Sequence, residues 1–327
     1  MKISNQIKVL YIAGWGRSGT TILDNILGQY NGLLSTGEIR YIWQRGLLEN
    51  RLCGCGTPLR ECTFWRNVLD PVVGNDQAKI EYMAYWTENG LRSRHIPMLV
   101  LPGAGNRLIS RMDTYRYTLA SLYQEVKKRS ESQVIVDSSK FPTYGYILDS
   151  IPNIDLYVVH MVRDPRAVAY SWIRKKEMKD RGSNKYMRGH SPIESTFFWL
   201  LWNSTIEALW KKNGPEKYIL LRYEDFVQDP KGTTEHILDM VGVSTQENTP
   251  FVDQNTVKLS PTHTVSGNPS RFSTGEVKIK PDDEWKEKLD ARSKLLITSL
   301  AMPMMHHYGY LNLVILVIML VLMYASA

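Results

Sequence analysis

The sequence predicts an α/β fold in which helices flank a parallel sheet, and two observations carry this prediction. Short apolar runs alternate with longer stretches of helical periodicity through most of the 327 residues. Strands of a parallel sheet are buried on both faces, so they read as continuous apolar runs. A glycine-rich turn also joins the first apolar run to the first helical stretch, which is the order of a phosphate-binding strand–loop–helix unit. At this length we expect one large domain.

The expected elements follow one another along the chain in this alternating order. The predicted strands are residues 7–13, 133–136, 155–162 and 218–221. The predicted helices are residues 22–27, 113–128, 165–176, 195–212 and 233–241. Residues 32–131 form a long excursion that is rich in Trp, Tyr, Arg and Cys. Because excursions of this length usually carry function, we expect this insertion to cap a site.

Composition indicates a globular protein with an anionic partner. Hydrophobic residues make up 43% of the chain and charged residues 22%, which is neither a disordered chain nor one with several membrane spans. The net charge of +7 suits an anionic ligand or a membrane surface. The basic residues are scattered along the chain, so we expect no nucleic-acid partner. The first residues lack a secretory signal, and we expect the domain to face the cytoplasm.

The C-terminal tail is strongly apolar. Residues 308–327 contain no charge, and residues 311–324 are almost entirely Leu, Ile, Val and Met. About 20 apolar residues are needed to span a bilayer, and the tail just reaches that length. We therefore expect a domain at 1–310 followed by a C-terminal apolar helix, 311–327, that anchors the protein in a membrane. The alternative is a helix that packs on the protein or on a partner.

The most informative segment is Gly14-Trp-Gly-Arg-Ser-Gly-Thr-Thr21, between the first strand and helix. Glycines let successive amide groups point inward, and the helix start adds the positive end of its dipole, so the segment is a predicted anion cradle. Thr20 stands where a nucleotide-hydrolysing P-loop carries its lysine. This disfavours an ordinary ATPase or kinase. Arg17 can supply the missing positive charge.

A second anion-binding segment follows the strand at 155–162. Its sequence is Arg163-Asp-Pro-Arg-Ala-Val-Ala-Tyr-Ser171. Pro165 suits the first turn of a helix with Asp164 as N-cap, so Arg163 projects from the carboxyl end of a strand. Ligands of open α/β sheets bind at those ends. Ser171 is placed to face the same ligand.

Together these segments resemble the nucleotide-binding motifs of sulfotransferases that use 3′-phosphoadenosine 5′-phosphosulfate (PAPS). Gly16-Arg-Ser-Gly-Thr-Thr21 resembles the 5′-phosphosulfate loop, and the segment around Arg163 resembles the 3′-phosphate motif. The segment from His263 to Phe272 is similar to the late loop that closes over the nucleotide. The resemblance implies a P-loop-like sulfotransferase fold, PAPS as co-substrate, no essential metal, and adenosine 3′,5′-bisphosphate as second product. It is nearer to the bacterial, carbohydrate and tyrosylprotein branches than to the cytosolic small-molecule branch.

The resemblance assigns cofactor-binding roles to single residues. For the 5′-phosphosulfate these are Arg17, Ser18, Gly19, Thr20 and Thr21. For the 3′-phosphate they are Arg163 and Ser171, and Tyr223 is assigned to the adenine. Gly267, Asn268 and Arg271 are the late-loop residues that the resemblance adds.

Sulfuryl transfer needs a base for the acceptor hydroxyl and cations for the developing charge. No histidine lies between Lys2 and His95. Glu38 resembles the glutamate that the tyrosylprotein and some bacterial relatives use, so we expect Glu38 to be the base. The resemblance gives Lys140 and Arg17 the role of neutralising the reacting groups. Asp137 is the alternative base or a helix N-cap, and Arg40 is expected to orient Glu38 or to bind an acidic acceptor.

Three cysteines lie close together in the insertion, at Cys53, Cys55 and Cys62. Their spacing matches no common zinc finger, and zinc needs a fourth ligand. We therefore expect a structural loop without metal, anchored by Phe64 and Trp65.

The acceptor is expected to be a hydroxyl of a carbohydrate, a lipid or a small molecule. Aromatic and basic residues of the insertion are either acceptor contacts or helix core; they are Tyr82, Tyr85, Trp86, Arg92, Arg94, Tyr115 and Tyr117. Two other functions stay open at this point. One is a P-loop nucleotide kinase or NTPase, and the other is a non-catalytic, membrane-tethered nucleotide-binding protein.

Overall fold

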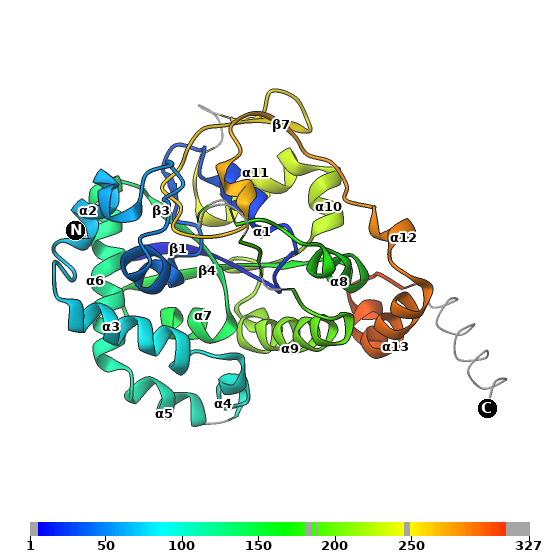
Figure 1. The fold of residues 1–327 in the computed structure, drawn as a ribbon, viewed down its shortest axis with the longest axis horizontal. Helices are drawn as coiled ribbons and strands as arrows, with labels where there is room; N and C mark the ends of the chain where they lie inside the picture. The colour runs from blue at the N-terminus through cyan, green and yellow to red at the C-terminus, as the bar shows by residue number, and fades with distance from the viewer. Residues whose placement is uncertain are drawn as a thin grey trace.

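A five-stranded parallel sheet forms the centre of the computed structural model, which describes residues 6–101, 103–178, 180, 185–187, 189–244 and 249–311 (Figure 1). The strand order is β2-β3-β1-β4-β5. The strands are β1 Ile7–Ala13, β2 Leu33–Ser35, β3 Val134–Lys140, β4 Ile154–Val162 and β5 Tyr218–Arg222. A separate antiparallel pair, β6 (Thr256–Leu259) and β7 (Gly275–Lys278), lies late in the chain.

Helices cover both faces of this sheet, as predicted. Successive residues of β1 enter different cores, because Tyr11 packs in one apolar cluster and Leu10 in another. The Tyr11 side is covered by α6 (Asp113–Ser130), α7 (Pro142–Asp149) and α9 (Pro192–Trp210). The Leu10 side is covered by α1 (Thr20–Leu27), α10 (Tyr223–Gln228) and α11 (Pro230–Val241). The sheet is therefore the middle of three layers.

A third apolar cluster connects the late helices to the carboxyl end of β4. It contains Trp15 after β1, Val168 of α8 (Pro165–Ile173), Trp199 of α9 and Met305 of α13 (Ala291–His307). The short helix α12 (Trp285–Lys288) precedes α13. This packing holds the turn after β4, which carries Arg163, in a fixed position.

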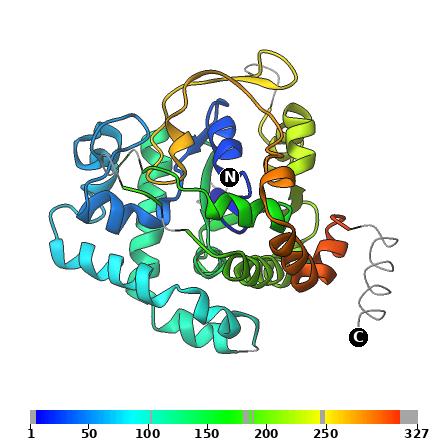
Figure 2. The ribbon, with the colours of Figure 1, turned by 45° about the vertical axis from the view of Figure 1, so that its right-hand side comes forward.

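The insertion lies on one side of the sheet, opposite α12 and α13 in both views (Figures 1 and 2). Its helices are α2 Thr63–Leu69, α3 Gln77–Tyr85, α4 Ile96–Val100, α5 Ala104–Ser110 and α6. Its buried Trp43 and Trp65 belong to the same apolar cluster as Tyr11 of β1, so the insertion extends the main core. Short turns of 3-10 helix occur at Ile39–Tyr41, Leu59–Glu61, Ser93–His95, Lys211–Asn213 and Pro269–Phe272, and π-helical turns at Ile42–Leu48 and Trp86–Gly90.

The predicted strands and helices are all present, with differences at their ends. The helix predicted at 165–176 ends at Ile173, and the one predicted at 195–212 begins at Pro192, where Ser191 caps it by accepting a hydrogen bond from the backbone N–H of Glu194. The edge strand β2 was not predicted, because a three-residue strand is too short to show a pattern.

Within the described ranges, no helix combines the length and the apolar character that a bilayer crossing requires. The anchor predicted at 311–327 lies, after Leu311, outside the described residues. Anchoring of the chain and its position at a cytoplasmic face stay predictions.

Candidate active site

One cavity of about 1050 Å³ opens at the carboxyl end of the parallel strands and brings the predicted motifs together. Residues from the loop after β1, from the segment after β2, from the end of β3, from the turn after β4 and from the late loop all line it. The predicted site residues in its wall are Arg17, Gly19, Thr20, Thr21, Glu38, Lys140, Arg163, Ser171, Tyr223, Gly267, Asn268 and Arg271. Ser18 lies behind this wall and is 1% exposed.

The loop between β1 and α1 has the shape of an anion cradle. Gly19 is the N-cap residue of α1 and has φ of 93°, a left-handed conformation that favours glycine. A Cβ at this position would lie 2.4 Å from the ring of Tyr223, so the close approach also requires glycine. The Ser18 hydroxyl and the Arg17 Nε are buried without a hydrogen-bond partner among the described residues. Unpaired buried donors fit a loop that an anion completes.

Arg17 brings a positive charge to this loop from a constrained position. Its guanidinium lies over the Trp172 ring at 4.7 Å from the centroid, and its Nη2 donates to Met187 Sδ at 3.3 Å. Burial lowers the pKa of Arg17 to about 10, which leaves the side chain charged at neutral pH. Lys176 also lines the cavity, and burial, together with the charges of Arg17 and Arg174, lowers the pKa of Lys176 to about 8. Lys176 was not predicted.

The turn after β4 forms the second cationic part of the cavity. As predicted, Asp164 caps α8, where it accepts from the backbone N–H of Arg166 at 2.9 Å. Arg163 is thereby held at the end of β4, with its guanidinium 4.3 Å from the centroid of the Tyr223 ring. Ser171, near the end of α8, is 4% exposed and lines the same cavity.

Arg163 also has an acidic partner that the sequence analysis did not identify. Its Nη2 lies 3.2 Å from Asp282 Oδ2, and its Nη1 donates to the carbonyl oxygen of Arg17 at 3.2 Å. Asp282 lines the cavity, and its side chain is 36% exposed. An anion that binds Arg163 must therefore compete with this partly exposed carboxylate.

Glu38 and Lys140 form an ion pair in the wall of the cavity. Glu38 follows β2 and Lys140 ends β3, and the Lys140 ammonium donates to Glu38 Oε1 and, at 3.1 Å, to the carbonyl oxygen of Ser138. Arg45 Nη1 lies 3.9 Å from the other carboxylate oxygen. Burial alone would raise the pKa of Glu38, but Lys140 and Arg45 outweigh burial and lower that pKa below its ordinary value. Glu38 is therefore ionised at neutral pH and able to accept a proton.

Asp137 and Arg40 take structural positions. Asp137 is fully buried, does not line the cavity, and accepts from Tyr123 Oη at 2.6 Å and from the Ser139 backbone N–H at 2.8 Å. Burial raises the pKa of Asp137 to about 6. The expectation that Asp137 caps a helix is wrong, because the next helix begins at Pro142.

Arg40 is likewise buried, and its Nη2 donates to the carbonyl oxygen of Thr87 at 2.7 Å. Its guanidinium lies 3.7 Å from the centroid of the Phe141 ring. Arg45, which the sequence analysis did not single out, is the arginine that pairs with Glu38. The signal that could have found it is its position one to two helical turns after Glu38.

The late loop closes one side of the cavity. A Cβ built on Gly267 would lie 3.9 Å from Glu38 Oε1 and 3.9 Å from Thr21 Oγ1. The backbone N–H of Glu38 donates to the carbonyl oxygen of Ser266 at 3.1 Å. Arg271 is 3% exposed and donates to the carbonyl oxygens of Thr264 and Leu52. Arg271 thus fixes the loop to the insertion while still lining the cavity.

Aromatic residues line the rest of the cavity. They are Trp15, Tyr41, Phe141, Trp172, Tyr186, His190, Trp202, Tyr223 and Phe272. The aromatic and basic residues that were singled out in the insertion lie elsewhere, since none of them lines the cavity. Tyr115 is fully buried, whereas Tyr85 and Tyr117 are more than half exposed. The cavity-lining Trp15 and Trp172 lie inside or beside the anion-binding motifs, which is the signal that could have identified them.

Comparison with known proteins identifies a family and several similar proteins. A family model described as "Sulfotransferase family" matches residues 10–247. Carbohydrate sulfotransferase 2 of Mus musculus and of Homo sapiens are each 30% identical over 125 residues, which is 28% of this chain and 24% of the relative. The chain therefore matches about a quarter of the length of these relatives.

Among the similar solved structures, one supports the fold. The sulfotransferase domain of the olefin synthase from Synechococcus PCC 7002 superposes with a TM-score of 0.50 and 21% identity, over 93% of this chain and 96% of that domain. The sulfotransferase domain from the curacin biosynthetic pathway gives a TM-score of 0.47 and 15% identity, over 90% and 96% of the two chains.

Proposed function

Since the chain belongs to the sulfotransferase family, whose model covers most of its sheet and site, we propose that it transfers the sulfuryl group of PAPS to an acceptor hydroxyl, with Glu38 as base. The observation that carries the proposal is the meeting of the Arg17 loop, Arg163 and the Glu38–Lys140 pair in one cavity. Family membership favours this enzyme over the P-loop kinase and over a non-catalytic nucleotide-binding protein.

The chain's own residues fit PAPS as co-substrate. The loop of Arg17, Ser18, Gly19, Thr20 and Thr21 would hold the 5′-phosphosulfate, because its buried Ser18 hydroxyl and Arg17 Nε have no partner in the described part of the chain. Cradled backbone amides and a helix start favour the same charge.

The nucleoside end of PAPS would meet the turn after β4. Arg163 and Ser171 would hold the 3′-phosphate, and Tyr223, whose ring is already beside Arg163, would contact the adenine. Gly267, Asn268 and Arg271 would close the late loop over the nucleotide.

The proposed reaction uses these residues as follows. The acceptor hydroxyl oxygen forms a bond to sulfur while the bond between sulfur and the 5′-phosphate oxygen breaks. The hydroxyl proton passes to Glu38, and adenosine 3′,5′-bisphosphate leaves with the bonding electrons. Arg17 neutralises charge that develops on the leaving phosphate. Lys140, which lies against Glu38, donates to the sulfuryl oxygens and keeps Glu38 ionised before the proton arrives.

A carbohydrate hydroxyl is the acceptor class that we propose. The supporting observations are the aromatic wall of the cavity, whose flat apolar rings suit the faces of sugar rings, and the polar side chains of Gln44 and Glu49 beside it. The partial likeness to carbohydrate sulfotransferase 2 points in the same direction.

The test is a transfer assay with radiolabelled PAPS and three acceptor panels: oligosaccharides, hydroxylated lipids and phenols. We expect label in oligosaccharide products, with one adenosine 3′,5′-bisphosphate released per sulfate ester formed. Label in lipids or phenols alone would reject the carbohydrate assignment. Failure to consume PAPS in any panel, with ATP consumed in the presence of Mg²⁺, would reject sulfuryl transfer.

A further inference from the structure

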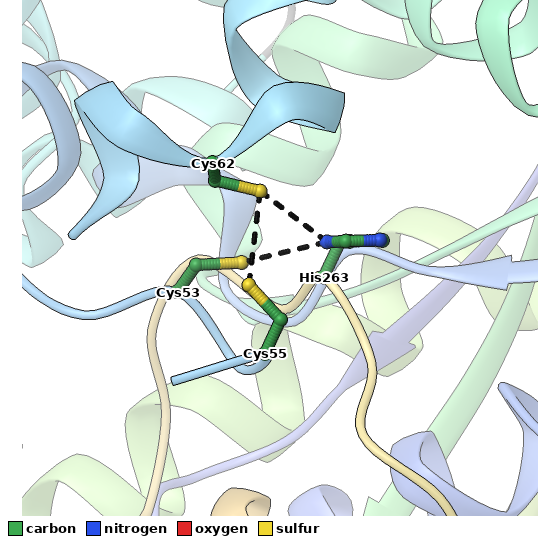
Figure 3. A group of neighbouring side chains, drawn as sticks. All are labelled: Cys53, Cys55, Cys62 and His263. Carbon is green, nitrogen blue, oxygen red and sulfur yellow. Dashed lines mark hydrogen bonds between the residues drawn. The ribbon is translucent and has the colours of Figure 1, made fainter. Parts of the chain in front are cut away.

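Three thiols and one imidazole converge on a single point outside the active-site cavity (Figure 3). Cys53, Cys55 and Cys62 come from the insertion, and His263 comes from the late loop, about two hundred residues further along. The four candidate ligand atoms all lie within 4.8 Å of one another. The sequence offered three ligands and no fourth, and the fold supplies it.

Three of the distances in this cluster are close to those of a tetrahedral zinc site. The structure gives 3.8 Å between the sulfurs of Cys55 and Cys62, and 3.4 Å and 3.8 Å from His263 Nδ1 to the sulfurs of Cys62 and Cys53. With Zn–S of about 2.3 Å and Zn–N of about 2.0 Å, tetrahedral geometry places ligand atoms about 3.8 Å apart for two sulfurs and about 3.5 Å apart for sulfur and nitrogen. We propose that Cys53, Cys55, Cys62 and His263 bind one structural Zn²⁺.

The backbone around Cys53 and Cys55 already has the shape of a ligand loop. The Cys53 N–H donates to the Thr57 carbonyl at 2.8 Å, and the Gly56 N–H donates to the Cys53 carbonyl at 2.9 Å. Gly54 lies against the late loop, where its N–H donates to the Thr264 carbonyl and where a Cβ would be 2.3 Å from Thr264 Oγ1. Only glycine permits this approach, which brings the cysteines to His263.

The orientation of His263 is fixed by neighbours that are not ligands. Its ring stacks on Phe64, with centroids 4.9 Å apart and planes at 18°. Its carbonyl oxygen accepts from Trp65 Nε1 at 2.7 Å. These two contacts turn Nδ1 toward the sulfurs, which is how outer residues orient a histidine ligand in metal sites. Phe64 and Trp65 therefore do more than anchor a loop.

A disulfide is the competing use of these thiols. All three cysteines are free in the structure, and the odd number would leave one unpaired. A disulfide between Cys55 and Cys62 needs the sulfurs to approach from 3.8 Å to about 2.05 Å, and it gives the imidazole of His263 no role. Coordination uses all four groups.

The bound metal would connect the insertion to the late loop, which lines one side of the active-site cavity. Four residues after His263, the chain reaches Gly267 and then Arg271, and both line the cavity. None of the four ligands lines that cavity, and with four protein ligands no position is open for substrate, so the role is structural. The proposal stands on this geometry alone and does not rest on sulfuryl transfer.

The first test is elemental analysis of the full chain, expressed in zinc-supplemented medium and purified without chelator. We expect about one zinc per chain in the wild type, and loss of most of it in Cys62→Ser and in His263→Ala. His236→Ala is the matched control, because His236 is an exposed histidine on α11, and it should keep its zinc. Equal zinc content in all four proteins would overturn the proposal.

A second measurement uses only the wild-type protein, so it does not require any variant to fold. Wild-type protein grown in cobalt instead of zinc should show sulfur-to-cobalt charge-transfer absorption and the intense visible bands of tetrahedral Co²⁺. A chelator should remove those bands and lower the unfolding temperature. Protein that holds neither metal, or in which mass spectrometry finds a disulfide between two of the cysteines under reducing purification, would contradict the proposal.

Discussion

Replacing Glu38 by glutamine removes the proposed proton acceptor and keeps nearly the same shape. In the structure the carboxylate contacts Lys140 and lies 3.9 Å from Arg45, and these charges hold its pKa below the ordinary value. The base is therefore fully ionised at neutral pH. A positioned general base contributes about 10²–10⁴ in rate, so we expect kcat of Glu38→Gln to fall by that factor, or about 2.7–5.4 kcal/mol.

The pH dependence of the same reaction follows from the direction of that shift. Because the pKa of Glu38 lies below the ordinary glutamate value of about 4.3, Glu38 stays in its base form at about pH 5 and above. We therefore expect kcat/KM of the wild type to stay level between about pH 5 and 7 and to fall only at lower pH. In Glu38→Gln this acid limb should be absent. Binding of adenosine 3′,5′-bisphosphate should be unchanged or tighter, since a negative charge near the anion site is removed.

The assay is initial-rate transfer from radiolabelled PAPS, with thermal unfolding recorded for each protein. Glu125→Gln is the matched control: Glu125 lies on α6 away from the cavity and pairs with Lys128 and Arg129. We expect its kcat to be that of the wild type. A folded Glu38→Gln enzyme with kcat within threefold of the Glu125→Gln enzyme would refute the base assignment.

Other predictions address the remaining parts of the site. Asp137→Asn should lower the free energy of unfolding by about 1–3 kcal/mol, because the buried Asp137 carboxylate accepts three hydrogen bonds that the amide would weaken. The kcat of this variant should change by no more than a few-fold, and a loss of kcat as large as that of Glu38→Gln would make Asp137 the base. Gly19→Ala should weaken nucleotide binding at least about tenfold in calorimetry. The left-handed φ costs a non-glycine residue about 1–2 kcal/mol, and together with the clash against Tyr223 it shifts the loop away from its anion-binding shape. Unchanged affinity would show that the loop adapts. Nucleotide affinity should fall as pH rises through about 8, because Lys176 loses its proton there. Lys176→Gln should remove this pH dependence, and the same pH profile in the wild type and the variant would exclude Lys176 as its cause.

The parts of the site that the sequence predicted are local in the chain. The loop at Gly14-Trp-Gly-Arg-Ser-Gly-Thr-Thr21 and the turn at Arg163 each combine a strand end with a helix start, so their direction is set by a few neighbouring residues. Parallel strands end at one edge of the sheet, and this rule brings the two segments together without knowledge of the loops. The same rule places Lys140, at the end of β3, at this edge of the sheet.

The parts that the sequence did not predict depend on contacts between distant segments. Asp282 reaches Arg163, and His263 reaches Cys62, across chain separations that no periodicity reports. For the aromatic and basic residues of the insertion the sequence left two roles open, acceptor contact or helix core; none of them lines the cavity, Tyr115 is buried in the core, and Tyr85 and Tyr117 face solvent. Its contribution to the cavity comes instead from the turns that follow Glu38 and from Glu88.

The most direct test of nucleotide recognition is isothermal titration of the wild type and of Arg163→Ala with adenosine 3′,5′-bisphosphate, with ATP and Mg²⁺ as control ligand. Arg163 would give the 3′-phosphate a charge-assisted contact worth about 1.5–3 kcal/mol, so we expect the variant to bind about 10–150-fold more weakly, and the wild type to prefer the bisphosphate to ATP. Equal affinity of the two proteins for the bisphosphate, or tighter binding of ATP with Mg²⁺, would contradict the proposal that this cavity binds PAPS.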